Sequence, residues 1–159
     1  KGTHHAVEAA RRLGFPLTIA ARLLQRDVPY FEEKVKPFLT DGIRWIGEVD
    51  EQQRNELMQK ALCLLNPITY REPFGLVTIE AMACGCPPIA FHHGAVPEII
   101  DDGKTGFVVE NVEEMVEAVK KVDQIDRSAC RNHALEHFSA ERMAEGYEGI
   151  YEKVIAMKR

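Results

Sequence analysis

The sequence predicts an α/β fold: a Rossmann-like parallel sheet flanked by helices. Short apolar runs of strand length alternate with segments of helical periodicity along the whole chain. The run at residues 61–65 is apolar at every position, as in a parallel strand that is covered on both faces. The chain has 159 residues, of which 45% are hydrophobic and 28% charged, which is typical of one ordinary globular domain.

The expected elements alternate in chain order, and several carry termination signals. Strands are expected at residues 16–20, 43–46, 61–65, 88–91 and 106–109. Helices are expected at about residues 6–13, 30–39, 50–60, 74–84, 111–122, 126–137 and 139–157. Gly14 is placed to end the first helix, and Asp50 with Gln53 and Asn111 with Glu114 have the spacing of helix caps.

The last expected helix has a strongly apolar side. This side carries Met143, Tyr147, Ile150, Tyr151 and Val154. Such a stripe usually faces a core. We therefore expect Tyr147 and Tyr151 to be core residues rather than binding residues.

Composition argues against several classes of function. The net charge is −5 with the signs interspersed, so there is no electrostatic footprint for nucleic acid or an anionic membrane. No apolar run is long enough to cross a bilayer, and no signal-peptide pattern is present. Cys84 and Cys86 are too close together for the usual zinc spacing. We expect reduced, mostly buried thiols, a cytoplasmic location and no metal site.

Two glutamates, Glu72 and Glu80, stand on either side of the expected start of a helix. Glu72 lies in the longest loop after a strand, and Glu80 lies in the helix that follows this loop. Parallel sheets bind their ligands at such loops. The first amides of the helix have no partners within it and carry partial positive charge, which suits a phosphate or diphosphate. Gly75 would let such a ligand approach the backbone closely.

A carboxylate accepts two hydrogen bonds and so suits a pair of sugar hydroxyls. Glu72 and Glu80 could therefore hold hydroxyl groups on opposite sides of a bound diphosphate, as a nucleotide sugar would present them. The alternative is structural: Glu72 would cap the helix and Glu80 would pair with a buried arginine. Residue chemistry alone leaves both interpretations open.

The sequence from Glu72 to Pro87 resembles the E-x7-E segment of family 4 (group 1) retaining glycosyltransferases, which have the two-domain GT-B fold. Other segments of the chain resemble this family in the same order. They are residues 46–49, 94–100, 102–109 and 138–142. The similarity covers nearly the whole chain.

The resemblance implies that residues 1–159 are the C-terminal, donor-binding half of such an enzyme. Glu72 would be the catalytic-site glutamate that contacts donor-sugar hydroxyls, and Glu80 would hold the ribose. The donor sugar and diphosphate would lie against Lys1, Arg22, Phe74, Gly75, Leu76 and Val77. The base would meet the backbone of Ile46, Gly47 and Val49.

The chain departs from the family pattern before Lys1 and after the first expected strand. The family's strand with a glycine and an arginine is absent before Lys1, and Ala21-Arg22 replaces the usual glycine. Arg22 is therefore a candidate phosphate contact. The common Gly-Gly is replaced by Gly94-Ala95.

The resemblance also implies a mechanism and partners. A sugar would pass from a nucleotide diphosphate to an acceptor hydroxyl with retained anomeric configuration, without a metal or other cofactor. The carbohydrate or glycoconjugate acceptor would bind the missing N-terminal domain, where any peripheral membrane association would also reside. We expect the isolated chain to bind nucleotide without transferring sugar. The alternative is a non-catalytic nucleotide-sugar-binding or regulatory domain.

Overall fold

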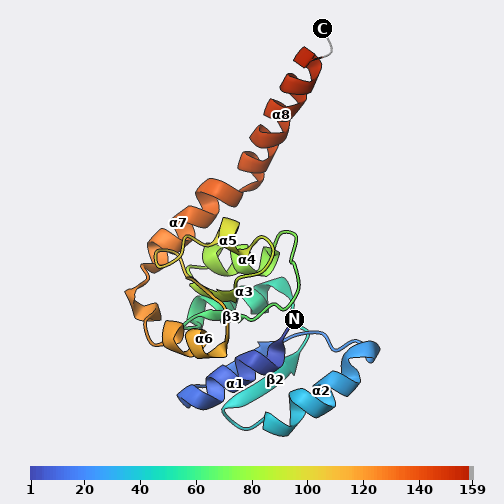
Figure 1. The fold of residues 1–159 in the computed structure, drawn as a ribbon, viewed down its shortest axis with the longest axis vertical. Helices are drawn as coiled ribbons and strands as arrows, with labels where there is room; N and C mark the ends of the chain where they lie inside the picture. The colour runs from blue at the N-terminus through green and yellow to red at the C-terminus, as the bar shows by residue number, and fades with distance from the viewer. Residues whose placement is uncertain (158–159) are drawn as a thin grey trace.

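The computed structural model describes residues 1–157, and its elements alternate as predicted (Figure 1). The strands are β1 (Leu17–Ala20), β2 (Ile43–Gly47), β3 (Leu64–Asn66), β4 (Pro88–Phe91) and β5 (Phe107–Val109). The α-helices are α1 (Thr3–Leu13), α2 (Val28–Lys34), α3 (Glu51–Lys60), α4 (Leu76–Ala83), α5 (Val96–Ile99), α6 (Val112–Val119), α7 (Arg127–Phe138) and α8 (Ala140–Met157). Short 3₁₀ helices lie at Gln25–Asp27, Lys36–Phe38 and Val122–Gln124.

The strands form two parallel sheets instead of one continuous sheet. β1 pairs with β2, and β3, β4 and β5 form a separate sheet in that order. In a doubly wound fold with strand order 3-2-1-4-5-6, the first strand lies at the centre. Among the described strands, β1 and β3 are not paired with each other.

Helix α1 packs against both sheets. Its residues Val7 and Ala10 are buried in one cluster with Ile19 of β1 and Ile43 of β2. On another side of the same helix, Ala9 is buried in a cluster with residues of β4, β5 and α6. Because small and apolar residues occupy both sides, α1 connects the two sheets without a shared strand.

The opposite face of the three-stranded sheet is covered by α4, α5 and α7. Met82 of α4, Ile99 of α5 and Cys130 of α7 are almost fully buried in one cluster with Ala90 of β4. Helices therefore flank this sheet on both faces, as predicted. This packing places the start of α4 at the carboxyl end of β3.

The predicted caps are present. Asp50 and Gln53 form a reciprocal capping box at α3, and the Asn111 side chain accepts from the Glu114 amide at α6. The predicted helix at residues 30–39 is shorter, since α2 gives way to a 3₁₀ turn that contains Pro37, which cannot donate a helical hydrogen bond. The short helix α5 was not predicted, and β3 begins three residues later than the predicted strand at 61–65.

The prediction that Tyr147 and Tyr151 are core residues is wrong for this chain. They are 55% and 61% exposed, and their rings stack on each other with centroids 6.2 Å apart. Helix α8 continues from α7 and extends away from the body of the molecule (Figure 1). The apolar side of the helix is present, but nothing in residues 1–157 covers it.

The cysteines are free thiols, and Cys86 and Cys130 are buried while Cys63 and Cys84 are partly buried. No three His, Cys, Asp or Glu side chains within residues 1–157 are arranged to hold a metal ion. None of the helices in the described chain combines the length and apolar character needed to cross a membrane.

The buried thiols predict a loss of stability at alkaline pH. Desolvation raises the pKa of Cys130 to about 12 and that of Cys86 to about 11, from an ordinary value of 9.0. Above pH 9 the unfolded chain releases these protons while the folded chain retains them, so stability that is fully present below pH 9 is lost as the pH rises. We expect about 1 kcal/mol of loss per thiol between pH 8 and 10, measured by urea unfolding.

The matched control is the double variant Cys86→Ala, Cys130→Ala. It should be less stable than the native chain at pH 8 because it loses buried volume. Its stability should nevertheless fall less steeply with pH. Equal slopes for the two proteins would contradict the assignment of this effect to the buried thiols.

Candidate functional site

The loop after β3 leads into the start of α4 and is anchored at both ends. Asn66, at the end of β3, is buried, and its side-chain amide donates to the Thr78 hydroxyl inside α4 at 3.2 Å. Gly75 is the N-cap of α4 with φ of 78°, a left-handed conformation that favours glycine, and no side chain caps the helix there. The first amides of α4 are therefore left without a side-chain acceptor, as an anion site at a helix start requires.

Glu72 lies in this loop with two polar neighbours. Its carboxylate accepts a hydrogen bond from the Tyr70 hydroxyl at 3.0 Å and lies 3.6 Å from Nζ of Lys1. Only 18% of its side chain is exposed. The pKa of the Tyr70 phenol is raised, mainly by desolvation and to a lesser extent by the hydrogen bond to Glu72. Lys1 and Glu72 are thus brought together, and the side chain of Glu72 is oriented rather than free.

The backbone of Glu72 packs directly against the loop after β4. The Ala95 amide donates to the Glu72 carbonyl at 2.9 Å. Gly94 has φ of 57°, and a Cβ at this position would lie 2.2 Å from the Glu72 carbonyl oxygen. No other residue type fits this contact without displacing the loop. The packing therefore requires a glycine at position 94.

Glu80 lies on α4 and pairs with an arginine of the neighbouring helix α3. Its Oε1 is 3.2 Å from a terminal nitrogen of Arg54, and the two side chains are 36% and 35% exposed. The structural alternative predicted that Glu80 pairs with a buried arginine; Glu80 does pair with an arginine, but Arg54 is about one-third exposed. It is wrong for Glu72, since Gly75 is the N-cap and no side chain caps α4.

The other predicted donor residues lie at the same helix start or at a separate edge. Phe74 and Leu76 are exposed large apolar side chains at the beginning of α4. Arg22 follows β1 and lies 3.9 Å from Glu48, and both of these side chains are largely exposed. The structure does not pair Arg22 with Glu72 or Lys1.

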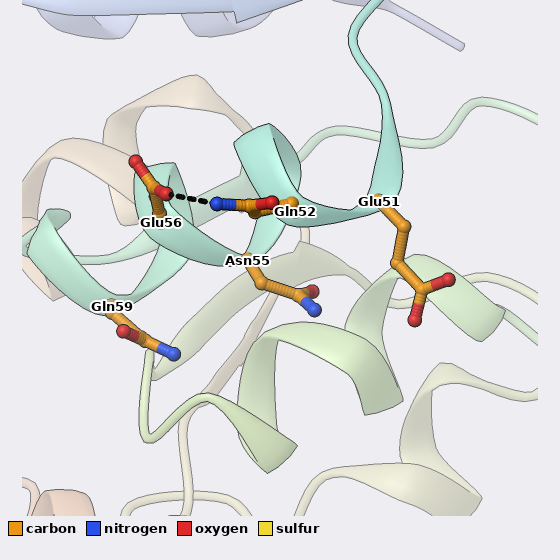
Figure 2. Close-up of a pocket in the computed structure, with 5 residues that line it drawn as sticks. All are labelled: Glu51, Gln52, Asn55, Glu56 and Gln59. Carbon is orange, nitrogen blue, oxygen red and sulfur yellow. Dashed lines mark hydrogen bonds between the residues drawn. The ribbon is translucent and has the colours of Figure 1, made fainter.

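Two shallow hollows lie along α3. One, of about 420 Å³, runs along a polar face of the helix, where Gln52 donates to Glu56 at 3.1 Å (Figure 2). The other, of about 390 Å³, is lined by Ile46, Glu48, Val49, Gln53, Glu56, Leu57 and Lys60. The second hollow contains two of the three residues predicted to meet the base. Neither hollow includes Glu72 or Glu80, whose site is an open helix start and not a closed cavity.

Sequence reasoning did not find Tyr70 and Arg54. Tyr70 lies two residues before Glu72 in a loop, where no periodicity fixes its direction. Arg54 lies in a polar helix, and its pairing with Glu80 depends on how α3 packs against α4. Only tertiary structure reveals these partners.

Gly94→Ala should displace the Glu72 loop or unfold the protein. The matched control is Gly103→Ala, because Gly103 also has positive φ, at 75°, but open space where its Cβ would be. The control should lose about 1 kcal/mol of stability from the left-handed conformation alone. Gly94→Ala should lose about 2 kcal/mol more from the clash, measured by urea unfolding. Equal losses would show that the contact with Glu72 does not restrain the loop.

Comparison with known proteins finds relatives that act on sugars or were solved with them. Alpha-maltose-1-phosphate synthase of Mycolicibacterium smegmatis is 31% identical, over 98% of this chain and 46% of the relative. The structure of HepE from Anabaena, in complex with UDP and glucose, matches with a TM-score of 0.78 and 21% identity, covering 94% of this chain and 45% of HepE. The C-terminal domain of LpcC from Francisella tularensis, a glycosyl transferase group 1 family protein, matches with a TM-score of 0.66 and 27% identity.

The match with LpcC covers 84% of this chain and 74% of the LpcC domain. Against the synthase and HepE, by contrast, the chain spans less than half of the known protein. The predicted fold is confirmed: the chain matches one Rossmann-like half of the GT-B structures. The sequence model of glycosyl transferases group 1 matches residues 1–137. The chain therefore belongs to the glycosyl transferases group 1 family.

Proposed function

We propose that this chain is the donor-binding half of a retaining glycosyltransferase that takes a sugar from a nucleotide diphosphate. The observation that carries the proposal is the uncapped start of α4 at Gly75, with an oriented glutamate on either side of it. Uncapped amides suit a diphosphate, and each carboxylate suits a pair of hydroxyls. A nucleotide sugar has hydroxyls on both sides of its diphosphate.

The proposed roles follow the layout of the site. Glu72 contacts hydroxyls of the donor sugar, and Glu80 contacts those of the ribose. The diphosphate lies against the backbone of Phe74, Gly75, Leu76 and Val77, with Lys1 and Arg22 as the available cations. The base lies in the hollow beside Ile46, Gly47 and Val49. The proposal includes no metal, because cations and helix amides would neutralise the diphosphate.

The relatives support sugar transfer. The synthase makes a sugar phosphate by its name, and HepE was solved with UDP and glucose. The chain corresponds to less than half of either protein. We therefore propose that the acceptor, a carbohydrate or glycoconjugate, binds a preceding N-terminal domain, and that a strand before Lys1 fills the space between β1 and β3.

The proposed catalysis is mainly electrostatic. The site would stabilise a diphosphate leaving group while holding an oxocarbenium-like sugar on the face where the acceptor arrives. Glu72 and Glu80 differ from the acid/base pair of a glycoside hydrolase, because one is in a loop and the other is on a helix with an arginine partner. With the acceptor half absent, the isolated chain should bind donor without transferring sugar.

Glu80→Gln should weaken nucleotide binding. Calorimetric titration of the chain with UDP, GDP and ADP should find one diphosphate that binds, and the variant should bind it about tenfold more weakly, because hydrogen bonds to a charged acceptor are the stronger ones. The matched control is Glu117→Gln on α6, which also removes a glutamate paired with a cation. Equal losses for both variants, or no binding by the folded native chain, would contradict the proposal.

Glu72→Ala should separate binding from transfer. In a protein that includes the acceptor half, the variant should lose transfer by about a hundredfold or more, since its contacts are to the reacting sugar. Affinity of the isolated chain for the free nucleotide diphosphate should hardly change, because that ligand lacks the sugar. Transfer that survives the substitution would contradict the role proposed for Glu72. A native protein that binds the nucleotide sugar but transfers nothing would favour the alternative, a non-catalytic nucleotide-sugar-binding domain.

A further inference from the structure

The ion pair between Arg54 and Glu80 is a contact between two helices, not between neighbours on one helix. Oε1 of Glu80 lies 3.2 Å from a terminal nitrogen of Arg54, with α4 and α3 supplying one residue each. The two side chains are about one-third exposed. An ion pair with this exposure stabilises a protein only weakly, because water and salt screen it. Stability alone therefore gives little reason for the pair.

The guanidinium of Arg54 is restrained on its inner side. Its Nε–H is buried and has no hydrogen-bond acceptor among residues 1–157. A buried donor without a partner destabilises the fold by about 1–3 kcal/mol, which is at least as much as a screened ion pair stabilises it. The packed Nε also prevents the planar guanidinium from turning freely, so its outer nitrogen stays directed at Glu80. This arrangement fixes geometry more than it adds stability.

Helix α3 is itself held at both ends. The capping box of Asp50 and Gln53 stabilises the first turn of α3, and Gln53 directly precedes Arg54. At the other end, Arg127 of α7 donates to the carbonyls of Gln59 and Ala61 at 3.1 and 2.9 Å. Arg54 therefore lies on a helix that is held at both ends. Precise positioning of the Glu80 side chain requires such a fixed helix.

We infer that Arg54 is a positioning residue, which holds the Glu80 carboxylate in the orientation that receives the ribose hydroxyls. The inference rests on the proposed function and deepens it. Arg54 engages Oε1, and no partner for Oε2 is described in residues 1–157. Without Arg54 the three-bond side chain of Glu80 would sample several rotamers, and ordering it would weaken binding. Arg54 thereby sets the preference for ribose over deoxyribose.

The same turn of α3 also faces the proposed base site. Gln53, adjacent to Arg54, lines the hollow that includes Ile46 and Val49. One turn of α3 would therefore contact the base through Gln53. Through Arg54, the same turn would orient the Glu80 carboxylate that receives the ribose hydroxyls. This arrangement links recognition of the two parts of the nucleoside through one helix.

The test is the discrimination between ribose and deoxyribose. The chain is titrated with UDP, GDP and ADP and with their 2′-deoxy forms, and the ratio of the two dissociation constants is measured for the diphosphate that binds. Arg54→Met should reduce this ratio about fivefold, and Arg54→Lys should restore part of it. Lys120→Met on α6, which removes another cation paired with a glutamate, should leave the ratio unchanged. General damage to the fold would weaken both nucleotides equally.

A double-mutant cycle with Glu80→Gln completes the test. If Arg54 acts through Glu80, Arg54→Met should have almost no further effect on the ratio in the Glu80→Gln background. Additive effects, or an unchanged ratio in a folded Arg54→Met variant, would overturn the inference while the proposed function stands. Loss of the ratio in Glu80→Gln alone would support the proposed function. A native chain that binds no diphosphate would overturn both.

Discussion

The close backbone contact between Gly94 and Glu72 determines where the loop that carries Glu72 lies. It is possible because β3 and β4 are parallel neighbours, with Asn66 opposite Ala90 at their carboxyl ends. The loops that follow the two strands therefore emerge at the same edge, and only a glycine allows them to touch at this distance. Once the loop is held, the start of α4 and the orientation of Glu72 follow from it.

The two glutamates have different surroundings for physical reasons. Glu72 lies in a loop, where Tyr70 and Lys1 orient a carboxylate that would otherwise be mobile. Glu80 lies on a helix, so its backbone is fixed and a single arginine suffices to direct its side chain. In the proposed function, both arrangements hold a carboxylate in place for the hydroxyl groups that a nucleotide sugar has on each side of its diphosphate.

Much of the fold could be predicted from local signals. The alternation of elements, the capping box at Asp50 and the position of the glutamates around a helix start depend on nearby residues, and the structure has all three. The division into two sheets, the partners Tyr70 and Arg54 and the exposure of Tyr147 depend on long-range packing. An apolar stripe shows that a helix has a face to bury, but it does not show whether the partner lies within the chain.

The most direct measurement is amide NMR of the chain during titration with UDP, GDP and ADP. We expect saturable shifts for one nucleotide, largest at the amides of Leu76 and Val77 and extending to Glu80 and to the hollow beside Ile46. Such a pattern would place the diphosphate at the uncapped start of α4 and the nucleoside along α3. Shifts confined to other surfaces, or none in a folded chain, would contradict the claim that this helix start is the donor site.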